Sequence, residues 1–215
     1  MYNISVEEKL HHLINVSHQA YLKGFTGGSG GNVSIRDGEY FYVSSTGTFL
    51  GSLVQEDFSC MDMEGNVIKG GKPSKEYVMH LECYRRRPDI QCIFHLHPLY
   101  SIAATCRPNI DYSCGMPVYT PGYALRINDI PVIPYFTPGS LELALKVAAV
   151  LEKRDSVLLQ NHGVVVAGKD PSSVFGIAEE IEENAHISVI LGNQGVPMTE
   201  EQIQKIREFG GHYGK

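Results

Sequence analysis

Helical and strand-like hydrophobic patterns alternate along all 215 residues, with no linker, repeat or low-complexity tract to separate them. Apolar residues recur at helical spacing in residues 10–21, and short apolar runs bounded by Gly, Asp and Pro follow in residues 33–69. A chain of this length fits one domain better than two. The pattern therefore predicts one α/β domain over residues 1–215, with a sheet between helical layers.

Capping signals place the ends of several elements. Ser5 with Glu8 and Thr199 with Gln202 have the spacing of capping boxes, and Asp170 precedes Pro171 as an N-cap precedes the first helical position. We expect helices at residues 5–24, 74–87, 139–154 and 170–192 and another from residue 199. We expect strands at residues 33–36, 40–44, 67–69, 90–96, 130–135 and 156–160, with residues 162–167 continuing into or beside the last of them.

Charge and cysteine content exclude several classes of protein. The 24 acidic residues outnumber the 18 Lys and Arg, and the net charge of −6 disfavours a nucleic-acid partner. The first residues lack a signal-peptide pattern, and no apolar run approaches the roughly 20 residues that span a bilayer. The 5 cysteines contain no C-x-x-C pair, which is typical of reduced thiols. We expect a cytoplasmic protein without a membrane partner, in which residues other than cysteine hold any metal.

Two histidines lie two residues apart in the apolar segment 93–98. In a strand, His95 and His97 point to one face while Phe94 and Leu96 point to the other. Two neutral imidazoles at this spacing can chelate one divalent ion, and the alternative is a pair of hydrogen-bonded core histidines. The spacing alone leaves both open.

A third histidine and a carboxylate strengthen the metal hypothesis. His162 follows the apolar strand at residues 156–159, where ligand sites gather in α/β sheets, although alone it reads as a turn residue. Glu76 lies in the first turn of the helix that we expect to begin at Ser74, a position the helix dipole favours without any function. Three histidines with an open fourth position are typical of catalytic zinc, and a nearby carboxylate serves as ligand, acid or base.

The glycine-rich segment 26–32 matches neither the P-loop nor the dinucleotide-binding fingerprint. Its backbone N–H groups, together with Ser45-Thr46-Gly47 and the helix start at Ser74, can cradle one phosphate group, and a purely structural role is the alternative.

Five short motifs occur in one order over nearly the whole chain: G-G-N-V-S-I-R at 30–36, S-S-T-G-T at 44–48, K-P-S-K-E at 72–76, H-L-H-P at 95–98 and Q-N-H-G at 160–163. Together they resemble the class II aldolase family of fuculose-phosphate aldolase and ribulose-phosphate 4-epimerase. The resemblance implies a three-layer α/β/α sandwich around a nine-stranded, mainly antiparallel sheet. It also implies a homotetramer with fourfold symmetry and active sites between neighbouring subunits.

The resemblance also implies roles for individual residues. One Zn²⁺ per subunit, or another divalent ion, would be held by His95, His97 and His162, with Glu76 touching the metal at rest and carrying a proton in turnover. Tyr123 and Tyr213 correspond to two tyrosines that complete the aldolase site. The substrate phosphate would be held by Gly31, Asn32, Thr46, Gly47 and Ser74.

The implied reaction is carbon–carbon bond cleavage in a small phosphorylated sugar or sugar acid. Zinc on a substrate oxygen stabilises the enediolate that remains, and both retro-aldol cleavage and decarboxylation of a 3-oxo acid pass through it. Lys75 stands where the aldolases commonly carry a second serine, and the runs 46–51 and 133–139 also resemble the 3-oxo-tetronate 4-phosphate decarboxylase branch. Lys75 either pairs with a substrate carboxylate or phosphate or is simply solvated.

We therefore expect decarboxylation to dihydroxyacetone phosphate and CO₂, with a fuculose-phosphate type of aldolase as the first alternative. A pentulose-phosphate 4-epimerase is less favoured, because that branch often has Asp where Glu76 stands. A non-catalytic, adducin-like binding domain is the remaining alternative, and such a domain should lack the three histidines.

Overall fold

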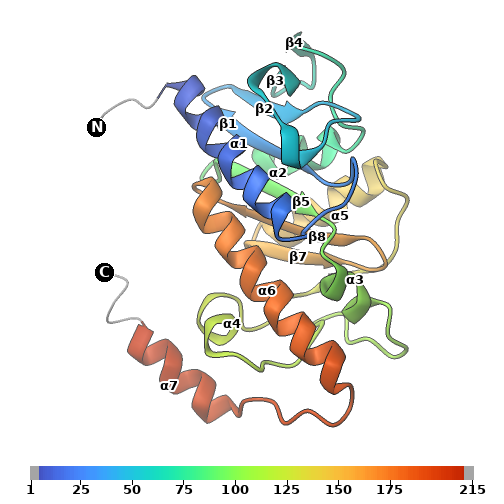
Figure 1. The fold of residues 1–215 in the computed structure, drawn as a ribbon, viewed down its shortest axis with the longest axis vertical. Coiled ribbons are helices and arrows are strands. Elements are labelled where there is room, and N and C mark those ends of the chain that lie inside the picture. The colour runs from blue at the N-terminus through green and yellow to red at the C-terminus, as the bar shows by residue number, and fades with distance from the viewer. Residues whose placement is uncertain (1–4, 211–215) are drawn as a thin grey trace.

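The computed structural model describes residues 5–210, which form three layers around one sheet (Figure 1). The strand order is β4-β3-β2-β1-β5-β8-β7-β6, and all neighbours pair antiparallel except β6 and β7. The three-layer, mainly antiparallel fold is thus confirmed. The strands are β1 (Asn32–Asp37), β2 (Tyr40–Ser44), β3 (Phe58–Asp62), β4 (Val67–Lys69), β5 (Cys92–Leu96), β6 (Val132–Ile133), β7 (Ser156–Leu159) and β8 (Gly163–Gly168).

The strand count differs from the expectation. The described residues contribute 8 strands to the sheet rather than the nine that the resemblance implies. Ser45 and Pro73 also pair, but only as an isolated antiparallel bridge. Proline has no N–H to donate to a ladder, so this pairing does not extend into a strand.

Helices cover both faces of the sheet. In Figure 1, α1 and α6 cross the face toward the viewer, while α2 and α5 lie behind it. The short helix α3 packs on α6, and α7 packs on α4. The helices are α1 (Val6–Leu22), α2 (Tyr77–Arg86), α3 (Leu99–Thr105), α4 (Pro121–Arg126), α5 (Leu141–Leu151), α6 (Pro171–Leu191) and α7 (Glu200–Gly210), with 3₁₀ turns η1 (Leu50–Ser52) and η2 (Gln55–Asp57).

Sequence patterns placed the long elements well and missed the short ones. The capping box at Ser5 begins α1, and Asp170 caps α6, both as expected. Strand β3 and helices α3 and α4 were not predicted. Helices α3 and α4 have 7 and 6 residues, which is too short for a helical hydrophobic period to stand out.

Two hydrophobic cores fill the space between the layers. Phe94 and Leu96 of β5 belong to the core under α1 and α6, whereas Ile93 belongs to the core under α2 and α5. Phe94 and Leu96 therefore point to one face of β5, and Ile93 and His95 point to the other. His97, which follows the strand, continues the second face. This alternation, predicted from the sequence, places the histidines on the α2 side of a strand that is buried on both faces.

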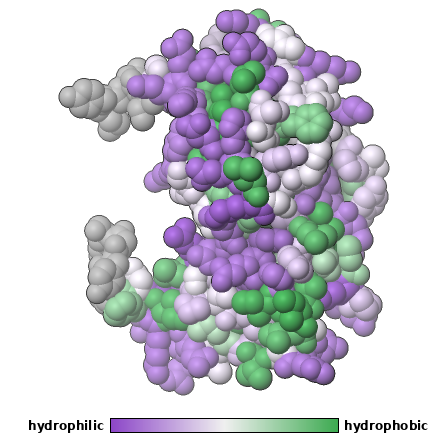
Figure 2. All heavy atoms as spheres, viewed as in Figure 1, coloured by the Kyte–Doolittle hydropathy of each residue, from purple (hydrophilic) through white to green (hydrophobic). Residues whose placement is uncertain are grey.

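Apolar side chains also reach the surface. Figure 2 shows several of them gathered on the lower part of the same view, near the C-terminal end of α6. Ile190, Leu191 and Val196 are exposed there. None of the helices in the described residues combines the length and hydropathy needed to cross a membrane.

Candidate metal centre

Four side chains converge beside the end of β5. The ligand atoms of Glu76, His95, His97 and His162 all lie within 4.8 Å of one another. They come from the turn before α2, from the end of β5 and from the turn between β7 and β8. The predicted ligand set is thus brought together, although its members are up to 86 positions apart in the sequence, from 76 to 162.

The sheet fixes the ring of His95. This residue is fully buried, and its Nδ1 lies 3.1 Å from the carbonyl oxygen of Val164 on β8. A carbonyl oxygen only accepts hydrogen bonds, so Nδ1 of His95 carries a proton and donates it to Val164, and Nε2 is the nitrogen that faces the cluster. Protein metal sites commonly orient a histidine ligand by this kind of bond from its other ring nitrogen.

The distances between the ring nitrogens suit one shared ion. The Nε2 atom of His95 lies 3.0 Å from Nε2 of His97 and 3.2 Å from Nε2 of His162. Two nitrogens bound to one tetrahedral zinc at roughly 2.0–2.1 Å stand about 3.3 Å apart. Both distances from His95 Nε2 are therefore close to the spacing that a shared metal ion requires.

Glu76 completes the cluster from a position other than the expected one. Helix α2 begins at Tyr77, so Glu76 is its N-cap residue and not part of its first turn. Its carboxylate turns toward the histidines instead of capping the helix: Oε2 lies 3.2 Å from His95 Nε2, and Oε1 lies 3.5 Å from His162 Nε2.

One oxygen of Glu76 has no hydrogen-bond partner. Oε1 is buried without a donor, whereas Oε2 accepts a hydrogen bond of 2.9 Å from Asn32 Nδ2. A buried carboxylate oxygen without a donor is costly, and a cation at the cluster would satisfy it. This orphaned atom and the three Nε2 atoms together fit a divalent metal.

Burial and charge set the protonation of these groups. Burial, reinforced by the charge of His95, lowers the pKa of His97 to about 3 and that of His162 to about 4, so both are neutral at pH 7. Burial alone would lower the pKa of His95 and raise that of Glu76, but their mutual attraction prevails and reverses both shifts. Neutral imidazoles and an ionised carboxylate are the forms that bind metal.

Close backbone packing holds the ligand strands in place. A Cβ atom added to Gly163 would lie 2.2 Å from the carbonyl oxygen of Leu96 and 2.9 Å from Cδ2 of His97. Gly31 has φ +73°, and a Cβ there would lie 2.8 Å from the carbonyl oxygen of His95. Only glycine fits these two sites without displacing a ligand strand.

A cleft of about 300 Å³ opens beside the cluster, and the predicted anion-binding residues line it. Lys75 is exposed at its edge and is the only lysine or arginine among the described lining residues. The N–H of Thr46 already donates to the carbonyl oxygen of Lys72, which leaves its hydroxyl for a ligand. The polar lining comprises Ser29, Gly30, Gly31, Asn32, Ser45, Thr46, Gly47, Ser74 and Lys75. Ser29, Gly30 and Ser45 belong to the loops that the sequence predicted as a phosphate cradle, although the resemblance gave them no individual role.

Comparison with known proteins decides the family. Residues 11–189 match the model of the class II aldolase and adducin N-terminal domain. The chain belongs to the class II aldolase and adducin family. It is 36% identical over 200 residues to 3-oxo-tetronate 4-phosphate decarboxylase of Haemophilus influenzae, covering 92% of this chain and 95% of the relative.

A second curated relative of the chain is named for a different activity. An L-fuculose phosphate aldolase of Methanococcus maripaludis strain C5 is 39% identical over 186 residues, covering 86% of this chain and 98% of the relative. The crystal structure of YgbL from Escherichia coli superposes with a TM-score of 0.88 at 30% identity, covering 94% of this chain and 100% of that one. Together with the His/Glu cluster, these relatives identify a metal-dependent lyase of the class II aldolase type.

The structure describes one of the two predicted catalytic tyrosines, Tyr123, and places it in the hydrophobic core. Tyr123 lies in the first turn of α4 and is fully buried in the hydrophobic core, with its hydroxyl unpartnered. Its burial raises the pKa of this phenol above the usual range. The ring lies in the core and does not line the cleft beside the histidines, so its catalytic role stays a prediction. Tyr213 lies outside the described residues.

Several polar side chains that support the ligands were missed. Glu182 of α6 accepts hydrogen bonds from the N–H groups of Tyr100 and Ser101 at the start of α3, just after His97. At the other end of α3, Thr105 Oγ1 accepts from the N–H of Asn161, the residue before His162. One short helix thus braces both ligand turns. The sequence carries no local signal for this, because the partners come from different elements.

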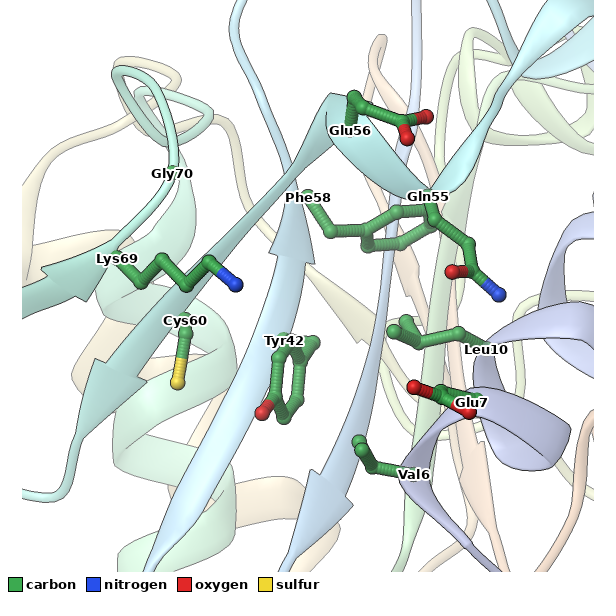
Figure 3. Close-up of a pocket in the computed structure, with 10 residues that line it drawn as sticks. All are labelled: Val6, Glu7, Leu10, Tyr42, Gln55, Glu56, Phe58, Cys60, Lys69 and Gly70. Carbon is green, nitrogen blue, oxygen red and sulfur yellow. The ribbon is translucent and has the colours of Figure 1, made fainter.

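A second hollow lies away from the metal centre. It has a volume of about 400 Å³ and is lined by residues of α1, β2, β3 and η2 together with Lys69 and Gly70 (Figure 3). It shares no lining residue with the cleft beside the histidines. Among the described residues, only the His/Glu cluster groups three or more metal-binding side chains, so the chemistry belongs to that cluster.

Proposed function

We propose that this member of the class II aldolase and adducin family is a zinc-dependent decarboxylase that converts a 3-oxo-tetronate 4-phosphate to dihydroxyacetone phosphate and CO₂. The observation that carries the choice is Lys75, an ammonium group at the edge of the cleft beside Glu76. A sugar-acid phosphate brings two anionic groups to the site, and the polar loops offer a cradle for only one of them. A lysine beside that cradle supports a substrate with a second anion. The relative from Haemophilus influenzae is named for this reaction.

Zinc would be held by His95, His97 and His162, with Glu76 as a fourth ligand at rest. When bound, it supplies a Lewis acid for the substrate oxygen on which negative charge develops. The nitrogen ligands favour zinc over magnesium or calcium, which prefer oxygen donors. We propose one zinc ion per subunit.

The residues of the chain supply orientation and a proton. The backbone and hydroxyl groups of residues 31, 32, 46, 47 and 74 bind the phosphate, and Lys75 pairs with the carboxylate or the phosphate. When the bond to the carboxyl carbon breaks, the electron pair moves toward the neighbouring keto oxygen and CO₂ leaves. The carbon that lost CO₂ then takes one proton: Glu76, ionised at rest, accepts this proton from water and passes it to the carbon.

The aldolase reaction is the first alternative, and the 39% identity to an L-fuculose phosphate aldolase favours it. It would use the same metal and the same proton carrier to release an aldehyde. An epimerase would add a re-addition step to that cleavage. A non-catalytic, adducin-like role is disfavoured, because all three histidines and Glu76 converge at one point.

One set of incubations separates these reactions. The zinc-loaded protein is incubated with 3-oxo-tetronate 4-phosphates and with fuculose and ribulose phosphates, and CO₂, aldehyde and dihydroxyacetone phosphate are each followed. We expect CO₂ and dihydroxyacetone phosphate in equal amounts from a 3-oxo-tetronate 4-phosphate. Aldehyde without CO₂ would reject the decarboxylase assignment in favour of the aldolase.

We further propose that residues 1–215 form a single cytoplasmic domain, which assembles as a homotetramer with active sites between subunits. The exposed Ile190, Leu191 and Val196 support an association surface. Sedimentation measures the assembly state. Mixing inactive His95→Ala and Tyr213→Phe chains should restore part of the activity if Tyr213 reaches a neighbouring site, and no recovery would argue that each chain carries a complete site.

A further inference from the structure

A buried chain of hydrogen bonds runs from the metal centre into the core between β1 and α2. Asn32 Nδ2 lies 2.9 Å from Glu76 Oε2, and Asn32 Oδ1 lies 2.6 Å from His80 Nε2. His80 Nδ1 lies 2.7 Å from Ser34 Oγ, which lies 2.8 Å from the hydroxyl of Tyr84. We call Asn32, His80, Ser34 and Tyr84 the buried relay. All four are buried, with exposed fractions of 3% or less.

Two periodicities bring these residues together. Glu76, His80 and Tyr84 recur every four residues and so lie on one face of α2, with Glu76 at its N-cap. Asn32 and Ser34 are two residues apart and point to one face of β1. Asn32 is also the register partner of His95 on β5. The relay therefore continues the metal centre along the helix and strand that meet beside it.

The Glu76 carboxylate at one end of the relay determines the direction of every hydrogen bond in it. An ionised Glu76 only accepts, so Asn32 must present its N–H₂ group there and its Oδ1 to His80. His80 must then carry its proton on Nε2, which leaves Nδ1 to accept from Ser34. Ser34 in turn accepts from Tyr84. Every donor points toward Glu76, and aligned bonds of this kind strengthen one another.

The protonation states of His80 and Tyr84 agree with this arrangement. Burial, aided by the charge of His95, lowers the pKa of His80 to about 3, so its ring is neutral at working pH. Burial keeps the pKa of Tyr84 well above its usual value, so its hydroxyl keeps its proton and donates.

We propose that His80 is a positioning residue for Glu76. His80 holds Asn32 in place, and Asn32 donates a hydrogen bond to Oε2 of Glu76. The other oxygen, Oε1, has no donor and is left to bind metal or carry the proton. This inference rests on the proposed role of Glu76 in proton transfer. It makes the two carboxylate oxygens unequal: one is anchored to the core, and the other is open to the site.

The test has a readout that does not depend on turnover. In zinc-loaded protein labelled with ¹⁵N histidine, the His80 signals, assigned by their loss in His80→Gln, should report a neutral ring with the proton on Nε2 from pH 5 to 8. A proton on Nδ1, or a ring that titrates in that range, would overturn the relay. The substrate incubations leave this result untouched, so failure of the reaction assignment and failure of the relay are distinguishable.

Kinetics of matched variants test the consequence. His80→Leu removes both hydrogen bonds of the His80 ring. We expect kcat to fall by about 10–100-fold, as is typical when the partner of a metal ligand is lost. The zinc content should stay at one ion per chain, and KM should change by no more than about twofold. His80→Gln keeps a donor and an acceptor and should recover much of the loss. Leu81→Ala, at a buried neighbour outside the relay, controls for loss of stability. Equal kcat in His80→Leu and Leu81→Ala, or no recovery in His80→Gln, would overturn the positioning role.

Discussion

The two sides of the cleft are built in different ways. The histidine side consists of side chains on a strand end and on two partly exposed turns, with His95 fully buried and its ring held by the carbonyl of Val164. The loop side consists of residues 29–31, 45–47 and 74–75, where backbone groups, hydroxyls and the exposed Lys75 face the cleft. Rigid strands suit a metal, which tolerates little variation in ligand geometry, whereas loops can change with the substrate. The histidine side therefore fixes the geometry of the ligands, and the loop side is where substrate preference can vary.

The largest effect is expected from removing the central ligand on the histidine side. His95→Ala should abolish stoichiometric zinc and lower kcat by at least about 10³-fold, because a Lewis acid contributes several kcal/mol and each 1.4 kcal/mol or so is tenfold. The fold should remain, as measured by circular dichroism. His11→Ala, at an exposed histidine, is the control and should keep metal and activity. Full activity of His95→Ala without bound metal would break the proposed mechanism.

A methyl group added on the histidine side should be costly, unlike one added in an open loop. Gly163→Ala should lower the free energy of unfolding by about 1–3 kcal/mol and weaken zinc binding, because its Cβ meets Leu96 and His97. Gly27→Ala is the matched control, since nothing lies within 4 Å of a Cβ there. Urea unfolding measures the free energy of unfolding of each variant, and zinc titration measures its metal affinity. Similar values for the two variants would contradict the tight packing that we assign to the histidine side.

Acid should destabilise the metal-free protein through its buried histidines. The pKa of His80 is lowered from 6.5 to about 3, so between these values the unfolded chain binds a proton that the folded chain does not. Stability therefore falls as pH decreases through this window, by up to about 1.4 kcal/mol per pH unit for this one group. In His80→Gln the slope between pH 6 and 4 should be smaller by that amount. If the free energy of unfolding, measured in urea, falls equally with pH in the native protein and in His80→Gln, then His80 does not contribute to the acid sensitivity.

The smallest effect is expected on the loop side. Lys75→Met should raise KM for a 3-oxo-tetronate 4-phosphate by about fivefold, because an exposed ion pair contributes about 1 kcal/mol or less. Its effect on a substrate without a carboxylate should be smaller. Lys72→Met, at an exposed lysine that does not line the cleft, is the control. An equal effect on both substrates would assign Lys75 to the phosphate instead of the carboxylate.

The sequence anticipated the ligands because their signals are local. The alternation of His95 and His97 against Phe94 and Leu96 follows from strand geometry alone, and the core confirms it. His162 was found because a polar turn interrupts an apolar run. Glu76 was predicted as the carboxylate of the site but was placed in the first turn of a helix beginning at Ser74. The helix begins at Tyr77, so Glu76 precedes it as the N-cap residue, and its carboxylate faces the histidines.

Other features could not be predicted because they depend on contacts between distant elements. Tyr123 matched a family position, yet the packing of α4 sealed its ring in the core. Glu182 braces α3 from across the molecule, with nothing in the sequence near it to indicate a partner. The spacing of Glu76, His80 and Tyr84 on one helix face is visible in the sequence, but its meaning required β1 as a neighbour.

The sequence by itself determined the element types, the faces of the strands and the identity of the metal-binding side chains. Periods of two and 3.6 residues fix which side chains share a face of one element. The tertiary structure decided which faces meet: the register between β1 and β5 places Asn32 beside His95, and the packing of α2 brings Glu76 and His80 to them. Register and helix packing are set by the whole core and not by any local segment, so the site appears only once the core has formed.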